Sequence, residues 1–192
     1  KEQTLESLAE VTIVVSNDED PAEAYALGLS SRPSTSQNIV VFTPRGAGPH
    51  GWQGNETKQR QIRRRFQLVG TTADAQRIWD VRRAIQVIRQ VCPSLSVPPV
   101  IKSDQALKEL VLLAVLFEPT QESLLLSNVT TDPQEWPDVL NLSRSITPQE
   151  LLALVSWRNE LEITPDVQDI AAFARRLAAD KRWQPAVDTH ND

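Results

Sequence analysis

The 192 residues are 40% hydrophobic and 23% charged, close to the average of globular domains, which argues against a disordered or fibrous chain. Their formal net charge of −5 argues against a general binder of nucleic acids, because such domains usually carry a basic surplus. The longest apolar run, residues 110–117, is far shorter than the roughly 20 residues that a membrane-spanning helix needs. We therefore expect one domain over residues 1–192, with no nucleic-acid partner and no membrane partner.

Cys92 is the single cysteine, so the chain has no internal disulfide, and no His or second Cys lies near it in sequence to form a metal site. We expect a buried, unreactive thiol, no metal and no cofactor. The sequence starts at Lys1 rather than at methionine, so we expect an upstream segment, either a removed signal peptide or an N-terminal domain of the same protein. The compartment is not fixed by the sequence; a removed signal peptide would place the protein in the periplasm or outside the cell.

Five short runs rich in β-branched residues or leucine predict strands. The first two, residues 11–16 and 38–43, are continuously apolar, which is typical of strands buried on both faces of a parallel sheet. The other three strands are expected over residues 97–101, 123–129 and 160–164.

Helices are predicted between these strands, and the strongest pattern covers residues 74–90. Its apolar residues recur at intervals of three or four, which places them on one helix face: Ile78, Val81, Ile85 and Ile88. The other helices are expected over residues 21–29, 106–117, 136–146, 148–155 and 167–183. Strands alternating with helices predict an α/β fold, a three-layer sandwich with a mostly parallel, doubly wound sheet of about five strands.

Several segments occur in the order found in one enzyme family. The turn Pro44-Arg45-Gly46-Ala47-Gly48 follows the second strand, a basic segment follows the turn, and a helix with the sequence R-I-W-D-V-R-R-A-I covers residues 77–85. This order resembles α/β-hydrolases of the acetyl xylan esterase and dienelactone hydrolase type over about residues 38–130. The resemblance implies an incomplete α/β-hydrolase-like sheet, with about five strands rather than eight, so we expect the C-terminal domain of a longer protein.

The nucleophile turn of that family does not match this sequence. The family's turn reads G-x-S-x-G, because only small flanking residues let the strand-to-helix turn tighten and expose the serine. Here the segment reads Ser103-Asp104-Gln105-Ala106-Leu107, so Gln105 occupies the nucleophile position and Leu107 the second glycine position. The family's acid and histidine follow later in the chain; Asp166 fits the acid position, whereas His190 lies in a polar tail with no strand before it.

Two functions follow from these observations. The leading hypothesis is a catalytically silent domain, related to carbohydrate esterases, with a binding or structural role. The alternative is an active carboxylic-ester hydrolase of the acetyl-ester or polysaccharide deacetylase type. It would use a non-standard triad of Ser103, Asp166 and His190, or residues from a missing N-terminal part.

Ligands of doubly wound sheets bind outside the carboxyl ends of the strands. Polar residues after the second and third strands therefore predict a site for a small hydroxylated or anionic molecule, including a carbohydrate: Arg45, His50, Ser103, Asp104 and Gln105. A structural alternative is that Arg45 pairs with Asp104 and fills this site.

Two sets of side chains have both a functional and a structural interpretation. The basic cluster of Lys58, Arg60, Arg63, Arg64 and Arg65 can bind phosphate or a carboxylated polymer, but we expect it to pair with Glu56, Asp74 and Asp80. The five tryptophans can supply a sugar-stacking surface, but we expect most to pack inside the domain.

Overall fold

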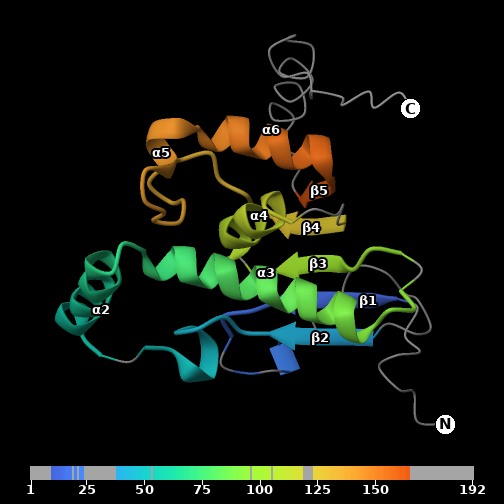
Figure 1. Ribbon diagram of the computed structural model, residues 1–192, viewed down its shortest axis with the longest axis horizontal. Coiled ribbons are helices and arrows are strands. Elements are labelled where there is room, and N and C mark those ends of the chain that lie inside the picture. Colours follow the sequence, from blue (N-terminus) through green and yellow to red (C-terminus); the bar gives the residue numbers. More distant parts are fainter. Residues whose placement is uncertain are drawn as a thin grey trace, which may run out of the picture.

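The computed structural model describes residues 10–18, 20, 22–23, 38–52, 54–95, 97–104, 106–118 and 123–164 (Figure 1). The helix expected over residues 167–183 lies outside these ranges, as does the helix expected over residues 21–29 except for residues 22 and 23.

Five strands form one sheet, in which every neighbouring pair is parallel, as the sequence predicts. The strands are β1 (Val11–Val15), β2 (Asn38–Phe42), β3 (Val100–Ser103), β4 (Ser123–Ser127) and β5 (Glu160–Thr164). Their order is β2-β1-β3-β4-β5, which is a common doubly wound order. The chain runs from β1 to β2 in one direction and then returns to place β3 on the other side of β1. The loops after β1 and β3 therefore leave the sheet in opposite directions, and this is the position where doubly wound sheets bind their ligands.

The helices are α2 (Glu56–Leu68), α3 (Ala73–Val91), α4 (Lys108–Leu116), α5 (Leu142–Ser145) and α6 (Pro148–Arg158). Figure 1 shows α3, α4 and α6 side by side over one face of the sheet. Right-handed crossovers from β2 to β3, β3 to β4 and β4 to β5 all progress in the same direction, so they place their helices on the same face. None of the described helices covers the opposite face, so the third layer stays a prediction.

The core forms between this helix layer and the sheet. All five residues of β1 are buried, and Val11, Ile13 and Val15 belong to the main hydrophobic cluster with the helices. The sheet edge is less protected, since every residue of β2 is half-buried. This contrast fits the central position of β1 and the edge position of β2.

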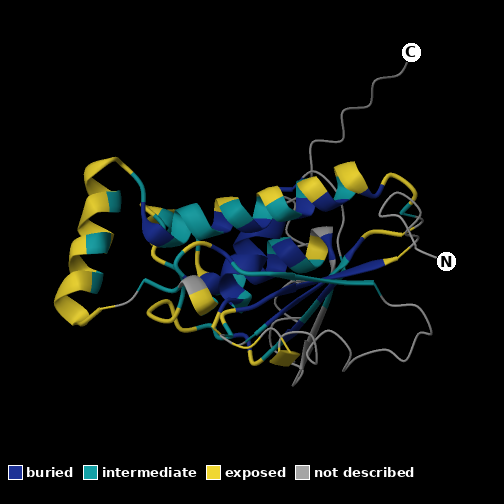
Figure 2. Ribbon diagram, turned by 90° about the horizontal axis from the view of Figure 1, so that it is seen from below, coloured by how far each residue is buried: buried dark blue, intermediate teal, exposed yellow. Residues whose placement is uncertain are grey.

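Helix α3 has the buried face that its periodicity predicts. The Thr72 hydroxyl accepts a hydrogen bond from the Ala75 N–H at 3.0 Å and caps the helix start. The expected stripe of four apolar residues, from Ile78 to Ile88, is buried, whereas Trp79 beside it is half exposed. Figure 2 shows this pattern as a buried side and an exposed side along one helix.

Two expected elements differ from the structure. The strand expected from residue 97 begins at Val100, after Pro98 and Pro99, because proline has no N–H for the sheet ladder. The helix expected over residues 136–146 is limited to α5. Pro137 disfavours helical backbone at Trp136, and Asn141, directly before α5, has a φ of 63°, which interrupts a right-handed helix. The segment between β4 and α5 is instead a long loop.

We expect Ile85→Ala to lower the free energy of unfolding by about 2–5 kcal/mol, because it leaves a cavity in the core at a side chain with 0% exposure. Val87→Ala on the same helix is the matched control, since Val87 is 44% exposed. Chemical denaturation monitored by circular dichroism measures both. Equal denaturation midpoints for the two variants would show that the buried face of α3 is assigned wrongly.

Candidate functional site

The candidate site lies at the carboxyl edge, where the chain leaves β1, β2 and β3. These strands end at Val15, Phe42 and Ser103, and polar residues follow each of them. The candidate site therefore lies at the position where the strand order predicts a ligand.

Asp104 organises the turn between β3 and α4. One carboxylate oxygen accepts hydrogen bonds from the N–H groups of Ala106 at 3.0 Å and Leu107 at 3.1 Å. The other accepts the Ser16 hydroxyl at 3.4 Å and the Asn17 N–H. The carboxylate thus fixes the turn before α4 and ties it to the loop after β1.

Ser103 lies at the end of β3 and is only 3% exposed. Its hydroxyl donates a hydrogen bond to the backbone carbonyl of Asp104 at 2.9 Å. The hydroxyl therefore supports the same turn and is not open to a solvent-borne substrate.

Arg45 is held by α3 rather than by Asp104, so the structural alternative in which these two residues pair is wrong. Its Nε and Nη2 atoms donate to the two carboxylate oxygens of Asp80 at 2.7 and 2.5 Å, and its Nη1 atom donates to Gln76 at 3.0 Å. The Arg45 backbone N–H also donates to Asp80, at 3.1 Å. The hydrogen bond from Asp80 raises the pKa of the Arg45 guanidinium above its usual value. Arg45 therefore anchors the turn after β2 to α3.

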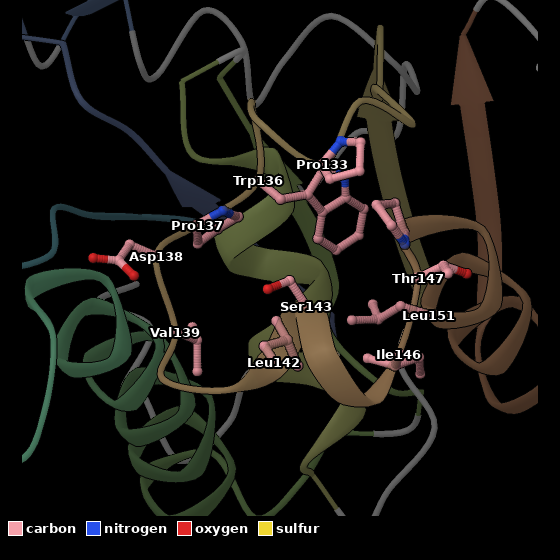
Figure 3. Close-up of a pocket in the computed structure, with 11 residues that line it drawn as sticks. Pro133, Trp136, Pro137, Asp138, Val139, Leu142, Ser143, Ile146, Thr147 and Leu151 are labelled. Carbon is pink, nitrogen blue, oxygen red and sulfur yellow. The ribbon is translucent and has the colours of Figure 1, made fainter.

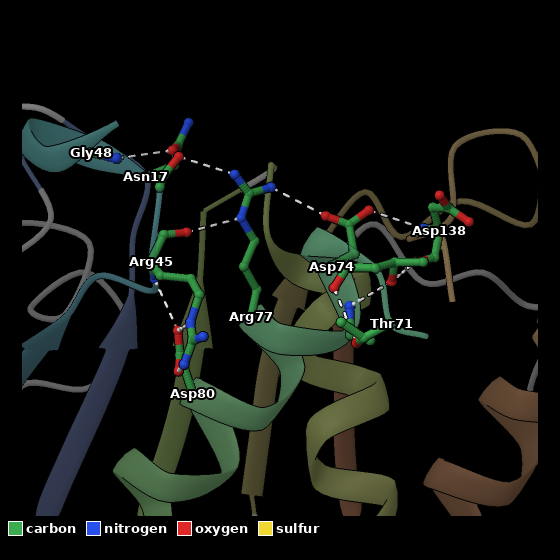
Figure 4. A network of polar contacts seen from close by, with 11 residues as sticks. Asn17, Arg45, Gly48, Thr71, Asp74, Arg77, Asp80 and Asp138 are labelled. Carbon is green, nitrogen blue, oxygen red and sulfur yellow. Dashed lines mark hydrogen bonds and ion pairs between the residues drawn. The ribbon is translucent and has the colours of Figure 1, made fainter. Parts of the chain in front are cut away.

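Arg77 joins the same turn to a third part of the chain (Figure 4). Its Nε and Nη2 atoms donate to the backbone carbonyls of Arg45 at 3.1 Å and Gly46 at 3.0 Å. Its Nη1 atom contacts Asp74 at 3.2 Å, and the other Asp74 oxygen accepts the Asp138 N–H at 2.9 Å. We call Arg45, Asp74, Arg77 and Asp80 the carboxyl-edge clamp, because these four side chains connect the turn after β2, α3 and the loop after β4.

The glycines of the turn serve the clamp and its tryptophan. Gly46 has a φ of +66°, and a Cβ at this position would lie 2.3 Å from the Trp52 ring. That ring covers the Arg77 guanidinium, with 5.1 Å between the guanidinium carbon and the ring centroid. Gly48 also has a positive φ, and its N–H donates to the Asn17 side chain at 3.1 Å. The turn is therefore explained by packing without a bound phosphate.

The remaining expected site residues have no described side chain. Gln105, Asp166 and His190 lie outside the described residues. His50 is the last residue of a short 3-10 turn, Gly48–His50. Only the backbone of His50 is described. The alternative triad and the role of His50 stay predictions.

The expectation for the basic segment is wrong except at Arg60, which pairs with Glu56 at 2.6 Å. Asp74 and Asp80 belong to the clamp instead. Within the described part of the chain, Arg63, Arg64 and Arg65 make no ion pair. The reason is geometric, since α2 projects from the body, as Figure 2 shows, and none of its residues is buried.

A buried carboxylate at the same edge was not anticipated from the sequence. Glu109, in the first turn of α4, accepts the Thr130 N–H at 3.3 Å, and Lys108 Nζ lies 3.7 Å from it. Burial raises the pKa of the Glu109 carboxyl despite these two contacts. The available signal was an acidic residue that, together with Lys108, interrupts an otherwise apolar helix sequence.

A hollow of about 310 Å³ lies beside the clamp, between the loop after β4 and the start of α6 (Figure 3). Trp136, Leu142 and Leu151 line it, and the Trp136 Nε1 atom donates to the Thr130 carbonyl at 2.9 Å. Asp138 links the hollow to the clamp, because it lines the former and its N–H is bound by Asp74 of the latter. The sequence did not indicate this hollow, because its wall is the segment that was expected to be helical.

The described residues contain no group of three or more His, Cys, Asp or Glu side chains that could hold a metal ion. None of the helices described is both long enough and apolar enough to cross a membrane. Cys92 is buried with a free thiol, as expected.

We expect Gly46→Ala to destabilise the fold by about 1–3 kcal/mol more than Gly70→Ala, because its added Cβ collides with Trp52. Gly70 is the matched control, since its φ is +77° but no atom lies within 4 Å of an added Cβ. The control alone should lose about 1 kcal/mol from the left-handed backbone. Equal losses in denaturant unfolding would contradict the close packing of Trp52 on the turn.

We expect Glu109→Gln to stabilise the fold at pH 7 and to lose this effect as the pH falls toward 4. The pKa of Glu109 is higher in the folded protein than in the unfolded chain. The protonated carboxyl therefore favours folding, and this contribution to the free energy of unfolding is lost as the pH rises and the carboxyl ionises. Glu150→Gln is the control of opposite sign, because hydrogen bonds from Thr147 lower the pKa of Glu150. That variant should be less stable at neutral pH. Unfolding free energies measured from pH 4 to 8 that show the same sign for both variants would refute this assignment.

Comparison of the chain with family models, with curated proteins and with solved structures found no match in any of the three. The structure shows the coarser part of the expectation, an α/β domain with an all-parallel sheet and flanking helices, and the hydrolase family itself stays a prediction.

Proposed function

We propose that this chain is a catalytically silent domain on an α/β-hydrolase-like scaffold, related to carbohydrate esterases, with a binding role. The observation that carries the proposal is the turn after β3. Ester hydrolysis by a serine needs a hydroxyl that is exposed to the acyl carbon and hydrogen-bonded to a base. Ser103 is buried, and its hydroxyl is bonded to a backbone carbonyl, which cannot act as that base.

The polar residues beside Ser103 support the same conclusion. Among the described residues, the Asp104 carboxylate accepts four hydrogen bonds, from Ser16, Asn17, Ala106 and Leu107. A carboxylate has about four acceptor positions, so these bonds leave little capacity for a substrate or a catalytic proton. Arg45 donates three of its five guanidinium N–H groups to Asp80 and Gln76, and the Asp80 carboxylate balances its charge, which weakens its attraction for an anionic substrate.

The resemblance supports the scaffold half of the proposal. The R-G-A-G turn and the R-I-W-D helix, which carry the resemblance, contact each other through Arg45, Arg77 and Asp80. These contacts hold loops in position and involve no reacting group. A domain can therefore keep them while its nucleophile position holds Gln105.

The binding half of the proposal rests on the hollow at the carboxyl edge. Its volume of about 310 Å³ falls at the lower end of the range for small-molecule sites. A domain without catalysis that keeps such a hollow at the ligand edge of the sheet is best explained as a binder of a small molecule.

We expect no turnover of p-nitrophenyl acetate or p-nitrophenyl butyrate above the buffer rate, and the same result for Ser103→Ala. Ser94→Ala is the matched control, because Ser94 is exposed in a turn away from the carboxyl edge. The release of p-nitrophenol is followed by absorbance, with an active esterase as the positive control. Turnover that disappears in Ser103→Ala but persists in Ser94→Ala would overturn the proposal and favour the ester hydrolase.

A further inference from the structure

The hollow beside the clamp has features that define a ligand class, and this inference rests on the proposed binding role. We propose that it binds a neutral aromatic molecule of one or two rings that carries one hydrogen-bonding group. Figure 3 shows Trp136, Leu142 and Ser143 turned toward the hollow, with Asp138 at its margin.

The volume sets the size of the ligand. An apolar cavity of about 150 Å³ holds one benzene molecule. The hollow measures about 310 Å³, roughly twice that volume, and it is open on one side. One ring with a substituent, or two fused rings, therefore fits, whereas a disaccharide would extend into solvent.

The lining favours an aromatic ring over a sugar. Most of the lining is apolar, with three prolines and the side chains of Val139, Leu142, Ile146 and Leu151 around Trp136. Each hydroxyl of a buried sugar needs a hydrogen-bonding partner, because an unpaired polar group loses free energy when it leaves water. An aromatic ring needs no such partners and can stack on the indole.

The polar side chains of the lining are few, and one of them is already engaged. The Thr147 hydroxyl donates to Glu150 at 2.9 Å and accepts the Glu150 N–H at 3.2 Å in the capping box of α6. The Ser143 hydroxyl is exposed and makes no hydrogen bond within the described residues, so it can pair with one polar group of a ligand. One open hydroxyl in the lining matches a ring with a single polar substituent.

The charge at the margin disfavours an anionic ligand. Asp138 lines the hollow, and its carboxylate has no cationic partner among the described residues. A carboxylate on the ligand would be repelled by it. The ligand is therefore neutral, which separates this site from the anion site expected at Arg45.

The walls are fixed before a ligand arrives. Trp136 is held through its Nε1 bond to Thr130. The backbone of Asp138 is held on both sides, since its N–H donates to Asp74 and its carbonyl accepts the Thr72 hydroxyl. A preformed site loses little conformational freedom on binding, which favours affinity for a small ligand.

The test is titration of the purified protein with phenol and 2-naphthol, followed by amide chemical shifts in two-dimensional NMR spectra. We expect saturable shifts at residues that line the hollow. Ser143→Phe, which fills the hollow with a ring, should weaken binding by at least about tenfold. Trp136→Phe should weaken binding measurably, whereas Trp157→Phe, at an exposed tryptophan of α6, should not.

Two further probes test the ligand class. Benzoate has a similar size to phenol but carries a charge, so it should bind about fivefold more weakly, and Asp138→Asn should reduce that difference. Xylobiose should cause no shifts in the hollow. Tighter binding of xylobiose than of phenol, unchanged affinity in Ser143→Phe, or shifts confined to the loops around Arg45 and Asp104 would each overturn this inference. Ester turnover is measured separately. Turnover would contradict the proposed catalytic silence, whereas absence of phenol binding at the hollow would contradict only the present inference.

Discussion

The carboxyl edge of this domain depends on the guanidinium of Arg77. Burial of apolar side chains fixes the strands and α3, but the loops that leave the sheet have no core of their own. Arg77 donates to two carbonyls of the turn after β2 and pairs with Asp74, whose other oxygen binds the loop after β4. Trp52 covers the guanidinium and shields these contacts from water, which strengthens them. One side chain thereby joins three segments that are far apart in the sequence.

In our proposal this arrangement is the reason why the polar residues of the edge make a poor catalytic site. Arg45 and Asp104 lie at the carboxyl edge, and both are engaged mainly in contacts within the protein. The same contacts position the neighbouring loop, because Asp138 is bound through its backbone to the clamp. In our proposal the binding role therefore belongs to the hollow that this loop encloses.

The sequence predicts what periodicity and local chemistry determine. The α3 stripe follows from helical spacing, and the parallel sheet follows from alternating strands and helices. It did not predict the partner of Arg45, because the choice between Asp80 and Asp104 depends on where α3 crosses the sheet. The sequence also did not indicate the hollow. The pattern over residues 136–146 predicts a helix, but the part that contains Pro137 forms the loop before α5.

The sequence resemblance and the proposed loss of activity have a common physical explanation. The residues that carry the resemblance, Arg45, Gly46, Arg77 and Asp80, contact one another and hold the scaffold. Any domain with this strand order needs its carboxyl-edge loops fixed, whether or not it performs a reaction at that edge. Catalysis depends instead on the few residues of the turn after β3, which the clamp does not constrain. A similarity built on scaffold contacts is therefore evidence for architecture, and the chemistry of the edge has to be judged from the turn and the hollow themselves.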